Sequence, residues 1–198
     1  PGVQLIAVID SNVERARQLA EPLKVRYADR LTPELGDVAA VNIAVPTVHH
    51  LAISRPLIER GIHVLIEKPL APTASDAEQI AALARRHDVI VQVGHTERFN
   101  PAVRAVDRLG LRPKFVETHR ISPFTFRSAD VGVVFDLMIH DIDIVLHLVR
   151  DEVQRVDAVG VNVLGKYEDI ANARVTCKGG AVANLTASRL ALKTERKL

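Results

Sequence analysis

The sequence predicts an α/β protein, in which a doubly wound parallel sheet is followed by a smaller α+β domain with an open, mostly antiparallel sheet. In residues 1–112, short apolar runs alternate with segments of helical periodicity, which is typical of βαβ units. In residues 113–198, closely spaced apolar or alternating runs are separated by turns, which indicates antiparallel strands. The length of 198 residues, at roughly 150 residues per domain, agrees with two unequal domains.

The first predicted elements are a strand and a helix. Residues 3–9 are apolar except for Gln4, as expected of a strand buried on both faces of a parallel sheet. Ser11 and Glu14 have the spacing of a capping box, and apolar residues then recur at helical spacing. The alternation continues through a strand at 39–45, a helix containing 53–58, a strand at 63–66, a helix at 75–86 capped by Ser75, and a strand at 89–93. Such units are right-handed and build a doubly wound sheet.

The second half contains further predicted strands and one helix. The strands are expected at 115–121, 153–163, 171–177 and 181–188. Gly179 and Gly180 form a turn between the last two strands, and the helix is expected at about 138–149.

Composition and charge exclude several classes of protein. Lysine and arginine total 26 against 24 acidic residues, and the two signs are interleaved, so neither a nucleic acid nor a membrane surface is expected as a partner. The apolar stretch at 131–149 is interrupted by charged residues and is too polar to span a membrane. Cys177 is the only cysteine, which excludes an internal disulfide bond and fits a reducing, cytoplasmic location.

Polar side chains follow several predicted strands, at the sheet edge where α/β proteins bind ligands. Asp10 ends the first strand, where a carboxylate either binds both ribose hydroxyls of an adenosine or caps the next helix. Pro46 and Thr47 follow the second strand and either touch a ligand or simply start a helix. Lys68 follows the next strand, where a partly desolvated amine acts on a substrate hydroxyl, or else belongs to an ordinary surface loop.

Ionisable residues gather near the start of the helix expected at 138–149. If that helix begins by Asp136, then Asp136, His140 and Asp143 lie on one side of it, and a carboxylate orients the imidazole and raises its basicity. A general base near neutral pH requires such an arrangement. Two other interpretations stay open: acidic residues that complement the helix dipole beside a solvated histidine, and a metal site, for which the sequence has no second ligand cluster.

In chain order, these residues resemble the Gfo/Idh/MocA family of sugar oxidoreductases. The motifs that carry the resemblance are Asp10 after a strand, Ala44-Val45-Pro46-Thr47 with His50, Glu67-Lys68-Pro69-Leu70, Gly94-x-x-x-Arg98-Phe99-Asn100-Pro101, and Asp136-x-x-x-His140-x-x-Asp143. The resemblance implies a dinucleotide-binding Rossmann domain at 1–112 and a substrate and oligomerisation domain at 113–198.

The resemblance also implies roles for individual residues. Lys68 is expected to position and polarise the reacting hydroxyl, His140 to take its proton, and Asp136 to orient the site while hydride passes to a nicotinamide. Asp10 is expected to hold the adenosine ribose and to favour NAD over NADP. The remaining implied contacts are Pro46, Thr47, His50, Glu67 and Lys68 on the cofactor, and Lys68, Arg98, Asn100, Asp136 and His140 on the substrate.

Departures from the commoner family pattern narrow the resemblance. The sequence departs from that pattern at His95-Thr96 and at Met138. These residues, and the segments 94–101 and 187–189, resemble the sequence pattern of the family branch that oxidises C3 of UDP-N-acetylglucosamine. The expected function is therefore NAD-dependent oxidation of a secondary hydroxyl of a sugar, with a nucleotide sugar as substrate and no metal. The alternative is a non-catalytic module that senses a dinucleotide or a sugar on the same fold.

The glycines and the chain ends suggest a fragment. No three of the 10 glycines form G-x-G-x-x-G, the phosphate-binding loop expected about 20 residues before Asp10. We expect the first βα unit to lie upstream of Pro1 and the second domain to stop within its sheet, so that the chain as it stands binds NAD poorly.

One face of the second sheet is predicted to be apolar and to bury itself against another subunit. The candidate residues for this face are Val161, Val163, Val175, Ala183 and Leu185. The sequence therefore predicts a homo-oligomer that forms through the C-terminal sheet.

Overall fold

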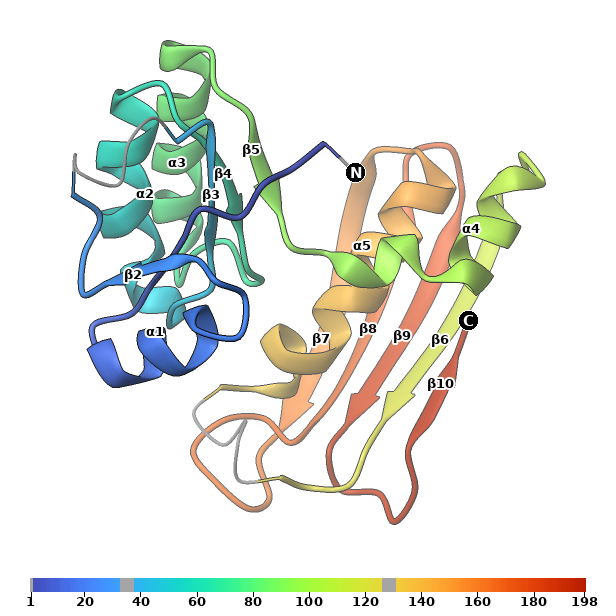
Figure 1. Cartoon of the computed structure of the whole chain (residues 1–198). Coiled ribbons are helices and arrows are strands. Elements are labelled where there is room, and N and C mark those ends of the chain that lie inside the picture. Colours follow the sequence, from blue (N-terminus) through green and yellow to red (C-terminus); the bar gives the residue numbers. More distant parts are fainter. Residues whose placement is uncertain (1, 33–37, 126–130) are drawn as a thin grey trace.

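The computed structural model describes residues 2–32, 38–125 and 131–198, which form two lobes (Figure 1). The first lobe contains parallel strands and helices, and the second contains a larger sheet with helices on one side (Figure 1). This arrangement confirms the predicted α/β class with a second α+β domain.

In the first lobe, every strand pairing is parallel. Strands β1 (Ala7–Ile9) and β2 (Arg26–Ala28) form one pair, and β3 (Ala40–Ile43), β4 (His63–Ile66) and β5 (Val91–Val93) form a sheet in the order β3-β4-β5. The helices are α1 (Val13–Ala20), α2 (His50–Glu59), preceded by the 3-10 turn Thr47–His49, and α3 (Ala74–His87). Helices α2 and α3 bury an apolar core against the sheet, made of Ile43, Leu57, Ile58, Val64, Ile66 and Ile80 among others.

The expectation of a strand at 3–9 that is buried on both faces is wrong, since the strand is shorter and Ile9 within it is 37% exposed. Only Ala7–Ile9 pair, and Val3 is 96% exposed. Within the described residues β1 pairs with β2 alone, so the apolar run before Ala7 has no neighbouring strand to cover it. An apolar run indicates that its side chains tend to be buried. Whether it forms a strand also depends on a neighbouring strand from elsewhere in the chain with which it can pair.

Both predicted helix caps are displaced from their expected positions. Helix α1 is capped by Asn12, whose side chain accepts a hydrogen bond from the backbone N–H of Arg15, and not by Ser11. Helix α3 is capped by Thr73, whose Oγ1 accepts from the N–H of Asp76 at 3.1 Å, and not by Ser75. Neighbouring residues of similar capping ability compete for this position, and local spacing does not distinguish them.

The second lobe is a five-stranded sheet in the order β10-β6-β9-β8-β7. Its strands are β6 (Phe115–Ile121), β7 (Val153–Val161), β8 (Ile170–Cys177), β9 (Val182–Ser188) and β10 (Glu195–Lys197). The β6–β9 pair is parallel and the other pairs are antiparallel, so the sheet is mixed but mostly antiparallel. A π-helical turn at Val134–Met138 leads into helix α5 (Ile139–Val149), which lies against this sheet.

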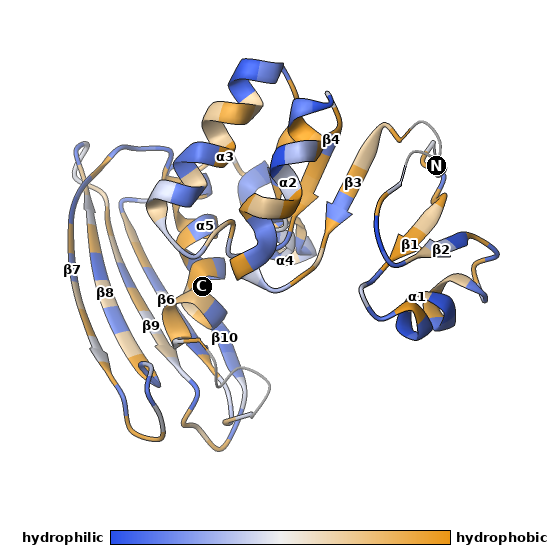
Figure 2. Cartoon of the chain, turned by 90° about the vertical axis from the view of Figure 1, so that its left-hand side faces the viewer, coloured by the Kyte–Doolittle hydropathy of each residue, from blue (hydrophilic) through white to orange (hydrophobic). Residues whose placement is uncertain are grey.

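Hydrophobic and hydrophilic residues alternate along the strands of this sheet (Figure 2), and successive side chains of a strand point to opposite faces, so the two faces differ in chemistry. Three of the residues predicted to form an open apolar face, Val175, Ala183 and Leu185, are instead buried in the core under α5. The opposite face carries polar pairs: Asn172 Nδ2 donates to Thr186 Oγ1 at 2.9 Å, and Arg174 donates to Asn184 at 3.2 Å. The prediction failed for those three because alternation alone does not say which face a helix covers.

The segment after β5 crosses from the first lobe to the second. A 3-10 turn at Thr96–Phe99 is followed by helix α4 (Pro101–Arg108), and Val103 of α4 packs on Ile144 and Leu148 of α5. Helix α4 thus packs on the second lobe, and the domain boundary at 112 and 113 stays a prediction. Among the described residues, no helix combines the length and the apolar character needed to cross a bilayer.

Candidate active site

A cavity of about 230 Å³ lies where the two lobes meet. It combines the end of β4, the turn after β5, strands β6 and β10, and the helical segment that leads into α5. The lining residues are Lys68, Glu97, Arg120, Ile121, Ser122, Asp136, Leu137, His140, Thr194 and Arg196. Three predicted catalytic residues, Lys68, Asp136 and His140, therefore share one cavity.

Lys68 reaches across the lobes to the start of the α5 segment. Strand β4 ends at Ile66, so the lysine stands just beyond the carboxyl end of the strand. Its Nζ donates to the backbone oxygen of Asp136 at 3.0 Å and lies 3.4 Å from the Oδ1 of the same residue. Both side chains are about three-quarters buried, so this contact is partly shielded from water. Asp136 consequently fixes the position of the ammonium group.

His140 is neutral near pH 7. Burial lowers its pKa from 6.5 to about 4, and the nearby charges of Lys68 and Arg120 act in the same direction. Its Nδ1 is buried and has no hydrogen-bond partner in the described part of the chain. The expectation that a carboxylate raises the basicity of His140 is therefore wrong, because desolvation and neighbouring cations dominate.

Asp143 pairs with Arg98. The Nε of Arg98 donates to Asp143 Oδ2 at 3.0 Å, and the second guanidinium nitrogen bonds the other carboxylate oxygen. This hydrogen bond also raises the pKa of Arg98 above its usual value. Arg98 therefore joins the turn after β5 to α5; it is not among the residues that line the cavity, and its place on the substrate side stays a prediction.

Asn100 likewise has a structural task. Its Oδ1 accepts from the N–H of Ala102 at 3.0 Å and caps helix α4. Asn100 is not among the residues that line the cavity, and its contact with substrate stays a prediction. Asparagine at the N-cap followed by proline at the first helical position is a common start of a helix, which explains why Asn100 caps α4.

A row of alternating charges at the cavity was not predicted. Arg120 donates two hydrogen bonds to Asp141 Oδ1, at 2.9 and 2.6 Å, and its guanidinium lies 3.8 Å from Glu97. Arg196 lies 3.3 Å from the same glutamate. Glu97 stands within the motif at 94–101 and could have been chosen from it. No sequence pattern around Arg196 indicated that it belongs to the site, because it reaches the cavity only through the pairing of β10 with β6.

The predicted cofactor residues lie at the carboxyl ends of the first-lobe strands. Asp10 follows β1; its Oδ1 accepts from the N–H of Asn12 at 2.8 Å, and its Oδ2 lies 3.6 Å from Arg15. Pro46 and Thr47 follow β3. This edge of a parallel sheet is where dinucleotides bind in Rossmann folds.

Glu67 follows β4 and lies against Gly94, which follows β5. A Cβ atom at Gly94 would lie 3.1 Å from the Glu67 carboxylate. The two loops therefore approach closely beside Lys68.

His50 is a correction to the predicted cofactor site. Its side chain is 1% exposed, and its ring nitrogens lie 2.9 Å from the carbonyl oxygen of Val45 and 3.1 Å from that of Leu70. The ring therefore ties together the loops after β3 and β4, and its side chain is not available to line a cofactor. In the described part of the chain, no group of acidic, histidine or cysteine side chains has the geometry of a metal site.

Comparisons with known proteins agree with this architecture. Residues 1–95 match the model of an oxidoreductase family with an NAD-binding Rossmann fold, and residues 110–197 match the Gfo/Idh/MocA C-terminal domain. The chain is 37% identical over 196 residues to the UDP-N-acetylglucosamine 3-dehydrogenase of Acidithiobacillus ferrooxidans, covering 98% of this chain and 63% of that protein. It is 28% identical over 207 residues to the scyllo-inositol 2-dehydrogenase (NAD(+)) of Bacillus subtilis, covering 96% and 60%.

Solved structures give the same result. A structure of the Acidithiobacillus ferrooxidans 3-dehydrogenase superposes with a TM-score of 0.92 at 37% identity, covering 98% of this chain and 64% of that one. GenD2 from gentamicin A biosynthesis, solved in complex with NAD, shares the fold with a TM-score of 0.84 at 24% identity, covering 99% of this chain and 61% of that one. The chain thus spans about three-fifths of the length of these relatives. With both of its halves matched, the chain belongs to the Gfo/Idh/MocA family of oxidoreductases.

Proposed function

We propose that the protein is an NAD-dependent dehydrogenase that oxidises a secondary hydroxyl of a nucleotide sugar, such as C3 of UDP-N-acetylglucosamine. The observation that carries this proposal is the convergence of Lys68, Asp136 and His140 on one cavity between the lobes. The sequence similarity to the Acidithiobacillus ferrooxidans enzyme supports the substrate class.

The cavity residues divide the chemistry of the hydroxyl between them. The Lys68 ammonium donates a hydrogen bond to the reacting oxygen and stabilises the negative charge that develops there. Neutral His140 accepts the proton of that hydroxyl. The bound nicotinamide supplies the acceptor for the hydride that leaves the same carbon. Asp136 holds the lysine in place, so the proton and the hydride leave from a fixed geometry.

The residues of the first lobe fit a dinucleotide. After bonding the N–H of Asn12, the Asp10 carboxylate retains lone pairs for two ribose hydroxyls. Pro46, Thr47 and Glu67 follow β3 and β4 of the three-stranded parallel sheet and would line the cofactor between the ribose site and Lys68.

The rim of the cavity fits an anionic substrate. The side chain of Arg196 is mostly exposed and pairs only loosely with Glu97, at 3.3 Å. A guanidinium group in this position suits a diphosphate, while the Glu97 carboxylate accepts from sugar hydroxyl or amide N–H groups. Arg120, buried against Asp141, fixes the glutamate between two cations.

The test is turnover of UDP-N-acetylglucosamine with NAD, followed by absorbance of the reduced cofactor, in a protein that also carries the phosphate-binding βα unit expected upstream of Pro1. We expect Lys68→Ala and His140→Ala each to lower kcat by at least about a hundredfold. Glu152→Ala is the matched control, since Glu152 pairs with Lys178 at the surface. Binding of both ligands without turnover by the unmodified protein would instead identify a sensing module.

A further inference from the structure

The helical segment that carries Asp136 and His140 is capped from outside. No side chain at its own start bonds the first turn of the π-helix. Instead, Glu168, from the loop between β7 and β8, bonds two successive backbone N–H groups. Its backbone oxygen accepts from Val133 at 3.0 Å, and its Oε1 accepts from Val134 at 3.2 Å. These N–H groups have no partner within a helix, so a remote residue satisfies them.

Gly132 allows this contact. A Cβ atom built at Gly132 would lie 1.9 Å from the Oε1 of Glu168, which is far inside van der Waals contact. Any side chain at this position would therefore displace the carboxylate. The backbone oxygen of Gly132 also accepts from the N–H of Asp136 at 3.0 Å, so the glycine connects Glu168 to the first turn of the site.

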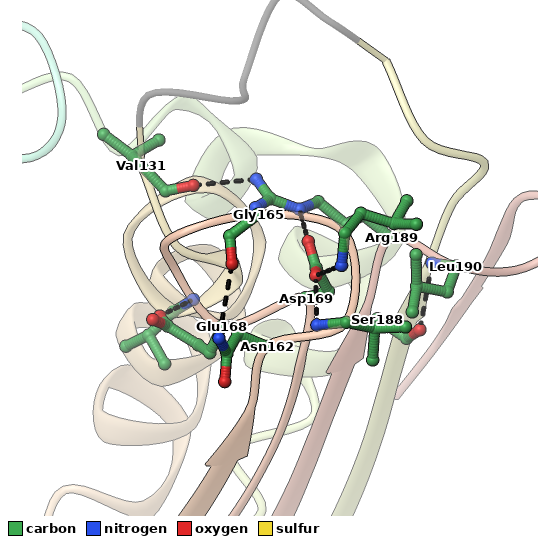
Figure 3. A network of polar contacts seen from close by, with 11 residues as sticks. Val131, Asn162, Gly165, Glu168, Asp169, Ser188, Arg189 and Leu190 are labelled. Atoms are coloured by element: carbon green, nitrogen blue, oxygen red, sulfur yellow. Dashed lines mark hydrogen bonds and ion pairs between the residues drawn. The ribbon is translucent and has the colours of Figure 1, made fainter.

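The loop that presents this glutamate is itself rigidly held (Figure 3). Asp169 is fully buried, and its Oδ2 accepts from the N–H groups of Val163 and Leu164 at 2.7 Å each. Its Oδ1 accepts from Arg189 Nε at 2.6 Å, and Arg189 also donates to the carbonyl oxygen of Val131 at 2.7 Å. The two backbone hydrogen bonds, and to a smaller extent the hydrogen bond from Arg189, lower the pKa of Asp169 to about 2. The Asp169 carboxylate that holds the loop therefore stays ionised.

We infer that Glu168 is a positioning residue for the catalytic cluster, because it fixes the first turn that places Asp136 and His140 opposite Lys68. The lysine donates to the backbone oxygen of Asp136, an atom whose position depends on that turn. A shift of the turn therefore moves the partner of Lys68 and the imidazole together. The kinetic part of this inference rests on the proposed function, and its structural part does not.

The kinetic test compares substitutions at both sides of the contact. Glu168→Ala is expected to lower kcat about tenfold and to leave KM within about twofold, because one charge-assisted hydrogen bond is lost. Glu168→Gln retains an acceptor oxygen and is expected to restore most of the rate. Gly132→Ala displaces the carboxylate and is expected to match Glu168→Ala. The double variant is expected to be no slower than either single one, since both remove the same contact.

A second readout needs no activity. The pKa of His140 depends on its burial and on the charges of nearby side chains, and its distances to them depend on the position of the first turn. These side chains are Lys68, Arg120, Glu97 and His95. In an NMR titration, Glu168→Ala and Gly132→Ala are expected to raise the pKa of His140 from about 4 toward its ordinary value as its burial decreases. Glu168→Gln and the surface control Glu152→Ala are expected to match the unmodified protein.

One pattern of results would overturn the inference. If the variants lower the melting temperature but leave both kcat and the His140 titration unchanged, Glu168 only stabilises the fold. If the unmodified protein turns over no sugar, the proposed function fails while the titration still decides the role of Glu168.

Discussion

At the scale of single residues, the sequence predicted three side chains that share one cavity, but it did not predict the contacts of some of their neighbours. Lys68, Asp136 and His140 were predictable because each carries its chemistry in a short motif that the fold brings to the cavity. The contacts of Arg98 and His50 were not, because Asp143 lies 45 residues from Arg98 and Leu70 lies 20 residues from His50. The local sequence shows which functional group a residue carries, but it does not show which distant group that residue contacts.

The neutral state of His140 makes stability depend on pH. Its pKa in the folded protein, about 4, lies below the ordinary 6.5, so between these values the unfolded chain binds more protons than the folded one. We expect the unfolding free energy to rise with pH through this window. Since the ring is only partly buried, its share is on the order of 1 kcal/mol. Urea unfolding at pH 4.5, 5.5 and 7 measures it.

The control for this prediction is His140→Gln, which removes the titrating group. The variant should lack the His140 contribution, so its stability should change less with pH across the same window. Equal pH dependence in both proteins would contradict the assignment of the low pKa to His140.

Asp10 is expected to control the choice of cofactor. Its negative charge at the end of β1 repels a 2′-phosphate, whereas Arg15, 3.6 Å away, would attract one. Replacing Asp10 with Ser is expected to lower the ratio of kcat/KM for NAD over NADP by at least about tenfold. Steady-state rates with both cofactors measure this ratio, and an unchanged ratio would place the ribose elsewhere.

At the scale of elements, periodicity predicted most of the strands and helices but not their ends. Strand β6 and strand β4 were predicted at their observed bounds, because their apolar patterns end at polar or glycine residues. Strands β2 and β10 were missed, since each has 3 residues, most of them exposed, and carries no apolar pattern. Short edge strands are defined by their partner and not by their own sequence.

Helix α3 offers a direct test of capping. Thr73 accepts from the N–H of Asp76 and donates its hydroxyl to the Asp76 carboxylate at 2.8 Å. We therefore expect Thr73→Ala to lower the unfolding free energy by about 1 kcal/mol. Ser75→Ala, two residues further on, is expected to change it by only a few tenths. Chemical denaturation of both variants measures the difference, and a larger loss at Ser75 would restore the cap predicted from the sequence.

At the scale of the whole molecule, the site exists only where the lobes meet. Lys68 comes from the first lobe, His140 from the second, and Glu97 from the segment that crosses between them. Arg196 enters through β10, which pairs with β6 at the edge of the second sheet. The motifs around Lys68 and His140 predicted one shared cleft. The position of Arg196 at its rim depends on the pairing of β10 with β6, which no sequence motif predicts.

We expect copies of the chain to associate through the open face of the second sheet, the face that α5 does not cover. Val159 and Val161 lie on that face, because they pair with Asn172 and Ile170, and they are 62% and 49% exposed. We expect light scattering to give a mass above that of a monomer, and the double substitution of Val159 and Val161 to Asp to lower it. Val156 is equally exposed but pairs with Val175, on the α5 side, so Val156→Asp is the matched control and should leave the mass unchanged. A monomeric unmodified protein, or equal dissociation by the control, would rule out association through this face.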